Sequence, residues 1–329
     1  MNFGIIGFGL HAAKRLMPGF ALAKSCRVTA LSRRELTKAQ ESARKYEIPL
    51  AFDSAEALCR SPQVDAVFVA TPNACHLQDV LVAAACGKPT LCEKPMAVNA
   101  EQCQQMVEAA HKAKVLLGIA QVFRFEDSLA WFRGKVAAGA IGKTIFARSE
   151  FSFRADGSHP RTWINDPIVA GGGPIADVGV HCVDALRFVL QDAVRRVSAR
   201  EIAGKPGNVE AGAALLLEFS RGTLATVMVS FRADYRTPLE LVGESGVLRA
   251  DNALTVDRPV RLELCRNGAV VESSTVSNEI AYARQVDAFA AAVQGKAEFP
   301  IPGEEGWRNQ QILDAAYRSI KSGRTEDMK

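Results

Sequence analysis

The sequence of 329 residues lacks several features that are typical of membrane, repeat or low-complexity proteins. It has no apolar stretch of the roughly 18 residues that a transmembrane helix needs, no internal repeat and no low-complexity segment. Basic residues outnumber acidic ones by only 40 to 36, a formal charge of +4. Such a small excess gives no strong reason to expect a nucleic-acid or membrane partner, so any anionic partner must bind to a local cluster of basic residues.

Neither a signal peptide nor a disulfide framework is indicated. The apolar run 3–10 has no basic segment before it and no clean cleavage site after it. The eight cysteines include no C-x-x-C pair, and most lie in apolar periodic segments, as Cys86 and Cys92 do. This usage is typical of reduced, buried thiols, and we therefore expect a cytoplasmic protein.

What the chain does have is an ordinary globular composition and room for about two domains. Apolar residues make up 48% and charged residues 23% of it, which argues against collagen-like, coiled-coil and largely disordered proteins. At roughly 100–200 residues per domain, the length indicates two domains. We place the boundary near residue 122, which gives a first domain over residues 1–121 and a second over residues 122–329.

Residues 1–121 alternate between short apolar runs, typical of buried strands, and longer segments with helical spacing. Strands are expected at 2–7, 26–32, 64–71, 89–92 and 115–121, with helices at 10–24, 35–45, 76–86 and 99–113. This alternation predicts an α/β, doubly wound Rossmann fold whose parallel sheet is covered on both faces. Because ligands bind at the carboxyl ends of such strands, we expect the segments that follow them to line one crevice.

Residues 122–329 have longer β patterns. Strands are expected at 143–154, 194–203, 212–219, 222–231, 239–248 and 260–265, with one amphipathic helix at 175–191. These segments predict an α+β domain with a large open, mostly antiparallel sheet. Helical patterns return at 282–294 and 304–322, the second of which could pack back on the first domain, and the tail 325–329 is expected to fray.

A glycine-rich turn follows the first expected strand and opens the first helix. Its pattern is Gly7-x-Gly9-x-x-Ala12, in which the first glycine permits a tight turn and the second lets a pyrophosphate approach the backbone. The alternative is a purely structural glycine turn, but the strand–turn–helix context favours dinucleotide binding. The candidate cofactor contacts in this turn are Gly7, Phe8, Gly9, Leu10 and His11.

The end of the second expected strand bears on the choice of cofactor. Ser32, Arg33 and Arg34 stand where an NAD site normally offers an acidic residue to the ribose 2′-hydroxyl. A hydroxyl backed by two guanidinium groups suits a 2′-phosphate instead. The alternative is a pair of solvated surface arginines. We therefore expect NADP(H) as the cofactor, with NAD(H) also possible.

Polar residues follow the third expected strand as well. Thr71, Pro72 and Asn73 lie where the crevice is expected, and His76 comes three residues later. All four are candidate cofactor-binding residues. For His76 the alternative is a packing or capping role, because a lone histidine near a helix start usually has one.

Glu93 and Lys94 follow the fourth expected strand and precede Pro95. This arrangement would bring an ammonium group to the cofactor crevice, so both residues are candidate cofactor contacts. On composition alone, the pair could equally be an ordinary ion pair of a surface loop.

Asp177 and His181 form the clearest candidate pair of the second domain. They are four residues apart on the expected helix 175–191, so the carboxylate and the imidazole share one face, and the glycine-rich segment 171–174 precedes them. The ordinary pKa of histidine lies near neutrality, which suits proton transfer. The alternative is a helix-stabilising pair. No set of Cys and His has a zinc-ligand spacing, so we expect no metal site.

Four segments together carry a family resemblance. GIIGFGLHA, ATPNACH, GKPTLCEKPMA and GGGPIADVGVHCVDALRF, in this order along nearly the whole chain, resemble the Gfo/Idh/MocA oxidoreductases. The segment HPRTWIND, with AGGGPI after it, is similar to the 1,5-anhydrofructose reductase and sugar-dehydrogenase branch of that family. The resemblance implies an NAD(P)-dependent oxidoreductase that acts on CH–OH groups of a sugar, anhydro sugar or polyol, as a homodimer or homotetramer.

The resemblance also implies roles for single residues. Lys94 would polarise the reacting C–O group beside the nicotinamide, and the Lys94–Pro95 bond is often cis in this family. His181 would be the general acid or base, and Asp177 would orient it and bond a sugar hydroxyl. The residues implied at the substrate mouth are Arg124, Arg161 and Trp163.

Two other functions stay open on the sequence. One is a non-catalytic NAD(P)-binding regulatory homologue, although such a protein would be expected to have lost Lys94 or His181, and both are present. The other is a redox-assisted glycoside hydrolase, which uses NAD transiently with no net oxidation.

Overall fold

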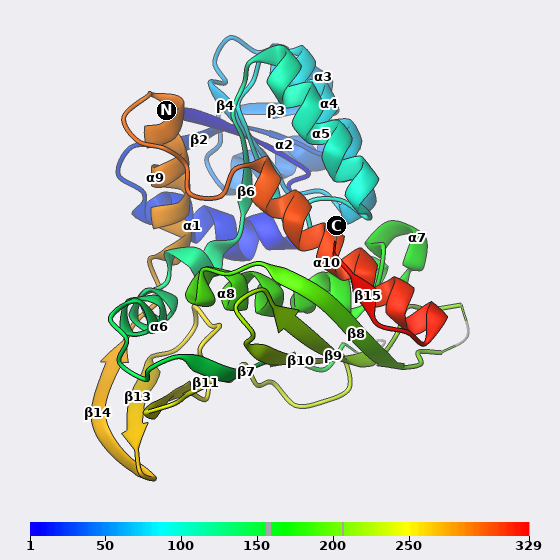
Figure 1. The fold of residues 1–329 in the computed structure, drawn as a ribbon. Coiled ribbons are helices and arrows are strands. Elements are labelled where there is room, and N and C mark those ends of the chain that lie inside the picture. Colours follow the sequence, from blue (N-terminus) through cyan, green and yellow to red (C-terminus); the bar gives the residue numbers. More distant parts are fainter. Residues whose placement is uncertain (156–158, 206, 329) are drawn as a thin grey trace. The chain divides into compact units, whose positions relative to one another are not determined.

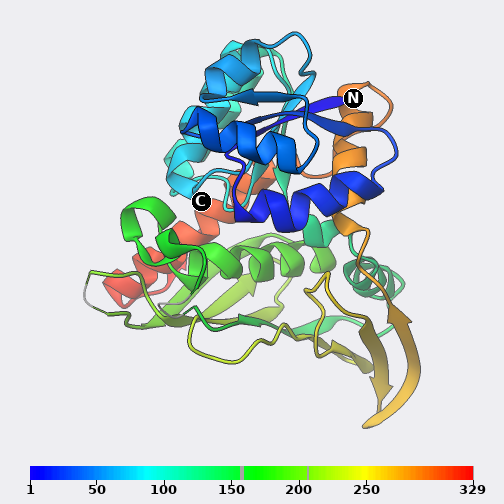
Figure 2. The same cartoon turned by 180° about the vertical axis from the view of Figure 1, so that it is seen from behind.

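The computed structural model describes residues 1–155, 159–205 and 207–328. They form two compact units (Figures 1 and 2). Unit 1 comprises Met1–Gln121 and Tyr282–Gln310, and unit 2 comprises Val122–Ala281 and Gln311–Lys329. Residues 282–310 therefore belong to unit 1, although they follow the second sheet in the sequence. The long last helix, α10 (Gly303–Ser322), therefore contributes residues to both units.

Unit 1 is built on a six-stranded parallel sheet in the order β3-β2-β1-β4-β5-β6. The strands are β1 (Asn2–Ile6), β2 (Arg27–Ser32), β3 (Leu50–Phe52), β4 (Ala66–Val69), β5 (Thr90–Glu93) and β6 (Leu117–Ala120). This order is that of a doubly wound dinucleotide-binding fold and confirms the predicted sheet. Only β3 was not expected, because three half-buried residues make too short a run to be recognised.

Helices connect these strands, and one further helix of this unit, α9, follows the second sheet in the sequence. They are η1 (Ala12–Leu16), α1 (Met17–Leu22), α2 (Leu36–Lys45), α3 (Ala55–Arg60), η2 (Asn73–Cys75), α4 (His76–Ala85), α5 (Ala100–Ala113) and α9 (Ala281–Val293). Two of them begin at a side-chain cap: the Ser54 hydroxyl accepts from the Ala57 N–H and the Asn99 carbonyl accepts from the Gln102 N–H. These caps fix where the connections end and the helices begin.

Phenylalanine rings form the core that joins β1 to its helices. Phe3 is fully buried, and its ring centroid lies 5.2 Å from that of Phe20 on α1 and 6.0 Å from that of Phe289 on α9. Burial of each such ring contributes roughly 1.5–3 kcal/mol. Helix α9 is therefore part of the Rossmann core, although it follows the second sheet in the sequence.

Unit 2 contains a nine-stranded sheet in the order β14-β13-β12-β11-β7-β10-β9-β8-β15. Its strands are β7 (Thr144–Ser152), β8 (Val194–Ile202), β9 (Gly212–Phe219), β10 (Leu224–Ser230), β11 (Leu239–Gly243), β12 (Gly246–Ala250), β13 (Val260–Arg266), β14 (Ala269–Val276) and β15 (Glu326–Asp327). All neighbours are antiparallel except β7 and β10. The mostly antiparallel sheet is thus confirmed.

Two expectations about the second sheet were wrong, and strand β14 was not expected at all. The expected strand 239–248 is a hairpin, β11 and β12, because the chain turns after Gly243. The tail 325–329 was expected to fray, but Glu326 and Asp327 pair with Val197 and Arg196 on β8, and the Met328 N–H donates to the Arg195 carbonyl. Backbone pairing with an edge strand is what orders this tail.

The helices of unit 2 are η3 (Val122–Phe125), α6 (Asp127–Ala137), η4 (Thr162–Asn165), α7 (Pro167–Ala170), η5 (Ile175–Gly179) and α8 (Val180–Leu190). Helix α8 packs against β7 and β10 and lies along one face of the sheet (Figure 1). The exposed side chains of Phe146, Leu216 and Leu224 extend from β7, β9 and β10. No helix in the described part of the chain is long and apolar enough to cross a lipid bilayer.

Candidate active site

The turn after β1 requires glycine at its first position and leaves space at its second. Gly7 has a φ of +82°, and a Cβ there would overlap the Thr71 side chain and stand 2.8 Å from the Thr71 nitrogen. A Cβ at Gly9 would meet only the Gly7 carbonyl oxygen, at 3.9 Å. The backbone at Gly9 is therefore open to the close approach of a phosphate at the start of a helix, as dinucleotide binding requires.

The end of β2 lies against this turn. The Phe8 N–H donates to the Ser32 carbonyl at 3.0 Å. Arg33 is half-buried, and its guanidinium donates to the Ser42 hydroxyl on α2 at 2.9 Å, whereas Arg34 is exposed. One of the two expected phosphate-binding arginines is therefore fixed by a neighbouring helix, and the other extends into solvent.

Lys94 follows β5 in a loop that a buried carboxylate holds. The Glu93 carboxylate lies 2.8 Å from His11 Nε2 and accepts the Lys94 N–H at 3.2 Å, and the Lys94–Pro95 peptide bond is cis. Burial by itself raises the pKa of Glu93, but His11 and Lys94 outweigh it and hold that pKa below its ordinary value. The His11–Glu93 contact fixes the lysine loop to the helix that follows the glycine turn, a link that the sequence did not reveal.

His76 is fully buried between two of the loops at this edge of the sheet. Its Nδ1 lies 3.0 Å from the Pro95 carbonyl oxygen and its Nε2 lies 2.9 Å from the Thr71 carbonyl oxygen. Burial lowers the pKa of His76. Asn73 is also buried, and the Pro72 carbonyl accepts the Cys75 N–H. The contacts of His76 are those of a side chain that holds two loops together, the alternative that the sequence left open.

In unit 2, Asp177 lies on η5 and faces the loop before η4. Both of its carboxylate oxygens accept hydrogen bonds from the Arg161 guanidinium, each at 2.9 Å. Arg161 also lies over the Trp163 ring, with the guanidinium carbon 6.0 Å from the ring centroid. The structure thus brings together three of the residues expected on the substrate side.

His181, on α8, lies among aromatic rings. Its ring centroid is 4.4 Å from that of Phe123 and 5.9 Å from that of Phe151, and the second pair is stacked with an interplanar angle of 25°. Only 6% of the residue is exposed. The two rings restrict the orientation of the imidazole.

Arg124, expected at the substrate mouth, takes part in a buried ion pair. Its Nε and Nη2 donate to the two carboxylate oxygens of Asp184 at 2.8 and 2.6 Å. The two side chains are 7% and 3% exposed. This pair anchors η3 to α8, and a contact of Arg124 with substrate stays a prediction.

Glu210 is a buried acidic residue near Asp177 that the sequence did not point to. It lies between β8 and β9, and its carboxylate accepts the N–H groups of Gly173 and Ile175, at the start of η5. Nothing in the local sequence distinguishes it from other acidic residues. Its partner loop, the triple glycine, was the only available signal.

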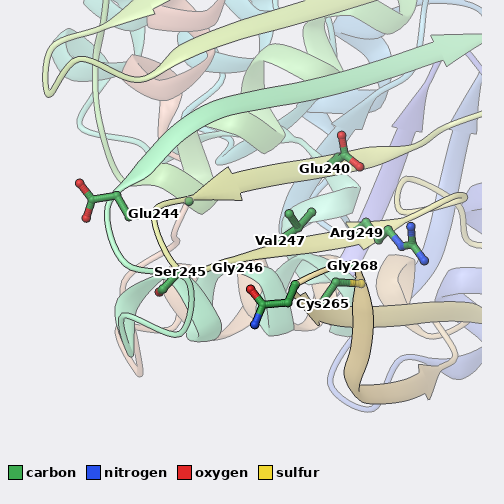
Figure 3. Close-up of a pocket in the computed structure, with 10 residues that line it drawn as sticks. Glu240, Glu244, Ser245, Gly246, Val247, Arg249, Cys265 and Gly268 are labelled. Carbon is green, nitrogen blue, oxygen red and sulfur yellow. The ribbon is translucent and has the colours of Figure 1, made fainter.

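A separate polar hollow lies between the turn that joins β11 to β12 and the turn that joins β13 to β14. Its lining includes Glu240, Glu244, Arg249 and Cys265 (Figure 3). None of the candidate residues lies in it. Within the residues described here, no group of three or more His, Cys, Asp or Glu is arranged to hold a metal ion.

Comparisons with known proteins agree with this geometry. Residues 1–121 match a family model described as an oxidoreductase family with an NAD-binding Rossmann fold, and residues 130–249 match the GFO/IDH/MocA C-terminal domain. A D-xylose 1-dehydrogenase (NADP(+)) of Haloferax volcanii is 31% identical over 98% of both chains. A 1,5-anhydro-D-fructose reductase of Ensifer adhaerens is 31% identical over 93% of this chain and 92% of its own.

Among solved structures, the aldose-aldose oxidoreductase from Caulobacter crescentus, complexed with glycerol, superposes with a TM-score of 0.91. It is 26% identical and covers 100% of this chain and 99% of its own. The glycine turn at the edge of a doubly wound sheet and the matched Rossmann model together define an oxidoreductase that binds a nicotinamide dinucleotide. The chain belongs to the GFO/IDH/MocA family, as the resemblance predicted.

Proposed function

We propose that the protein transfers a hydride between NADP(H) and a CH–OH carbon of a sugar, anhydro sugar or polyol. The substrate class is supported by the relatives, which are named for D-xylose, 1,5-anhydro-D-fructose and aldoses. The observation that carries the proposal is the His11–Glu93 contact at 2.8 Å, because it fixes the loop of Lys94 to the dinucleotide-binding turn. The backbone of Lys94 is thereby fixed at the carboxyl end of β5, the edge of the sheet where such folds bind a dinucleotide, which supports the proposed role of its side chain.

The cofactor supplies the hydride chemistry, and the chain supplies position, charge and a proton. Lys94 stabilises negative charge on the substrate oxygen, since an ammonium group favours a developing alkoxide. His181 gives a proton to that oxygen in the reductive direction and takes it in the oxidative one. Asp177, bound by Arg161, orients the acid–base residue and accepts a hydrogen bond from a substrate hydroxyl. Arg124 and Trp163 complete the proposed substrate residues.

The preference for NADP(H) over NAD(H) is proposed from Ser32, Arg33 and Arg34. Charge-assisted hydrogen bonds from guanidinium groups suit a 2′-phosphate, and no acidic side chain stands among these three. Arg33, already bound by Ser42, is the preordered group. Replacement of Arg33 or Arg34 by alanine should reduce the NADP(H) preference roughly tenfold or more, whereas alanine at the exposed Arg44 on α2 should leave it unchanged.

An absorbance assay at the nicotinamide band tests the whole proposal. NADP(H) and NAD(H) are each tried with aldoses, ketoses, anhydro sugars, inositols and diols. Lys94→Ala and His181→Ala should each abolish most turnover while NADPH still binds. Full activity in both variants would overturn the proposed roles, and a more than tenfold advantage for NAD(H) would overturn the proposed cofactor preference. If no compound turns over, the non-catalytic alternative is favoured.

We also propose that the protein forms a homodimer or homotetramer through the exposed face of the second sheet. A shallow hollow on β7, β9, β10 and β11 includes the apolar side chains of Phe146, Leu216 and Leu224 together with Arg148 and Glu240. Glu240 and Arg148 are cross-strand neighbours, so a second copy related by a two-fold axis can pair opposite charges over an apolar surface. Leu216→Glu should lower the assembly mass in light scattering, to monomers if the protein is a dimer and to dimers if it is a tetramer, and an unchanged mass would overturn this interface.

A further inference from the structure

One buried carboxylate holds the glycine loop that precedes the proposed acid–base residues. Oε2 of Glu210 accepts the Gly173 N–H at 2.9 Å, and Oε1 accepts the Ile175 N–H at 3.0 Å. The Tyr317 hydroxyl, from α10, donates to Oε1 at 3.1 Å. Pro174, between the two bound residues, has no N–H of its own. Every backbone N–H from residue 173 to residue 175 is therefore bound by this one side chain.

The glycines of this loop are explained by the same contact. A Cβ on Gly173 would overlap the Glu210 carbonyl oxygen and stand 2.9 Å from its carboxyl carbon. A Cβ on Gly172 would overlap the Tyr317 hydroxyl and stand 2.7 Å from the ring carbon that bears it. The loop is thus seated against Glu210 and Tyr317 at distances that only glycine allows. These contacts are those of a loop with one fixed position.

The fixed loop is also the origin of the helix that carries the candidate residues. The Asp177 N–H donates to the Gly173 carbonyl at 2.9 Å, and η5 continues without a break into α8. A displacement of Gly173 or Ile175 is therefore passed along one rigid element to Asp177 and His181. Groups at the first turn of a helix lack partners within the helix, so an external acceptor decides where that turn lies.

The segment of Glu210 contacts the other side of the proposed substrate region too. The Val209 N–H donates to the Asn165 carbonyl at 3.3 Å, at the end of η4. Val209 also packs with Ile164 and Phe231 in a small buried cluster. Trp163 lies on η4 and Arg161 directly precedes it, so residues 209–210 hold both of the segments that the Arg161–Asp177 pair joins.

We propose that Glu210, supported by Tyr317, is a positioning residue that sets the placement of Asp177 and His181. This inference rests on the proposed catalytic role of His181. A carboxylate suits the task because it accepts from two N–H groups at once, and charge-assisted bonds of this kind are stronger than neutral ones. Glu210 is 7% exposed, so water does not readily take its place.

The test uses the isosteric variant Glu210→Gln. Its amide keeps the volume but turns an NH₂ group toward one of the two N–H donors, which must then move away. We expect kcat to fall roughly 10- to 100-fold, the loss that a displacement of about 1 Å causes, with the NADPH dissociation constant unchanged. Tyr317→Phe removes one of the three hydrogen bonds and should lower kcat less. Glu201→Gln, an equal charge change at an exposed position of β8, is the control.

A second readout needs no substrate. The chain has five histidines, so the imidazole signals in an NMR spectrum can be assigned by loss of one signal in His181→Ala. The Phe123 and Phe151 rings shift the His181 signal according to its position. Glu210→Gln should move that signal and leave the signal of His111, on α5, unchanged. If Glu210→Gln does not fold, Tyr317→Phe is judged by the same measurements.

The outcomes separate the two proposals. Full activity in His181→Ala overturns the proposed function, while a shifted His181 signal in Glu210→Gln still supports the positioning of that ring. An unmoved His181 signal overturns the positioning role whatever the activity. A shifted signal with an unchanged kcat, in an enzyme that does depend on His181, overturns it as well.

Discussion

The Arg161 guanidinium binds both carboxylate oxygens of Asp177, with two hydrogen bonds of 2.9 Å. The Asp177 side chain is 7% exposed and that of Arg161 is 28% exposed. The spacing of Asp177 and His181 on one helix face did not reveal this partner. Because a bidentate pair fixes direction as well as distance, Arg161 defines which way the Asp177 carboxylate points.

Substitution of Arg161 should therefore reduce turnover without harming the cofactor-binding unit. Arg161→Lys keeps the charge but loses the two-point geometry, and we expect kcat to fall about tenfold; Arg161→Ala should cost about 100-fold. Steady-state kinetics and NADPH titration measure the two effects. The control is Arg261→Ala, which removes an exposed arginine of β13. Equal kcat in Arg161→Lys and the unmodified protein would show that the two-point contact is dispensable.

The two glycines of the nucleotide turn should respond differently to alanine. Gly7→Ala meets the Thr71 backbone at a positive φ, so we expect a loss of stability and a lower Tm. Gly9→Ala has space for its methyl group, so the fold should persist while the methyl occupies the path of a pyrophosphate. We expect the NADPH dissociation constant to rise at least tenfold in Gly9→Ala. Tight NADPH binding by a folded Gly9→Ala protein would contradict this assignment of the turn.

These local features were the predictable part of the molecule. The alternation of strands and helices follows from the pattern of apolar residues close together in the sequence. The doubly wound sheet and the glycine turn could therefore be predicted. Elements without their own pattern could not. Strand β3 is only three residues long. Strand β15 forms because the polar tail pairs with the edge strand β8, and the local sequence has no periodicity that predicts this pairing.

The candidate site likewise has a predictable part and an unpredictable one. Lys94 and His181 lie in recognisable motifs, whereas the side chains that hold those motifs are distant in sequence. His11 contacts Glu93 across 82 residues, and Glu210 contacts Gly173 across 37. Such pairs depend on how strands and helices pack, and no residue spacing in a single sequence predicts them.

The Arg124–Asp184 pair should matter more for stability than for chemistry. Removal of one member of a buried ion pair leaves an unpaired charge and typically costs about 3–5 kcal/mol. We expect a loss of that size in Arg124→Ala, measured by urea denaturation, and partial recovery in the double variant Arg124→Met/Asp184→Leu. The exposed pair of Arg154 and Asp234 is the comparison, and its removal should change stability little. A stable, inactive Arg124→Ala protein would instead favour the predicted contact with substrate.

Glu126 provides a prediction about pH. It is 1% exposed, and its Oε1 has no hydrogen-bond partner among the described residues. Its Oε2 lies 3.1 Å from the Ser128 hydroxyl, which also lies 2.9 Å from the Ala253 carbonyl oxygen. One hydroxyl hydrogen cannot serve both oxygens, so a protonated Glu126 that donates to Ser128 satisfies the group best. Burial indeed raises the pKa of Glu126 well above its ordinary value.

A raised pKa of Glu126 in the folded state makes the free energy of unfolding depend on pH. Above about pH 4.3, the ordinary pKa of a glutamate, the unfolded chain releases this proton while the folded chain keeps it. The free energy of unfolding should therefore fall by about 1.4 kcal/mol per pH unit from this group, until the folded pKa is passed. Glu126→Gln keeps the donor and removes the titration, so its stability advantage over the unmodified protein should be small near pH 4 and grow towards pH 7. Urea denaturation across this range measures the difference, with Glu201→Gln as the exposed control. A constant difference between Glu126→Gln and the unmodified protein would mean that Glu126 is ionised in the folded state.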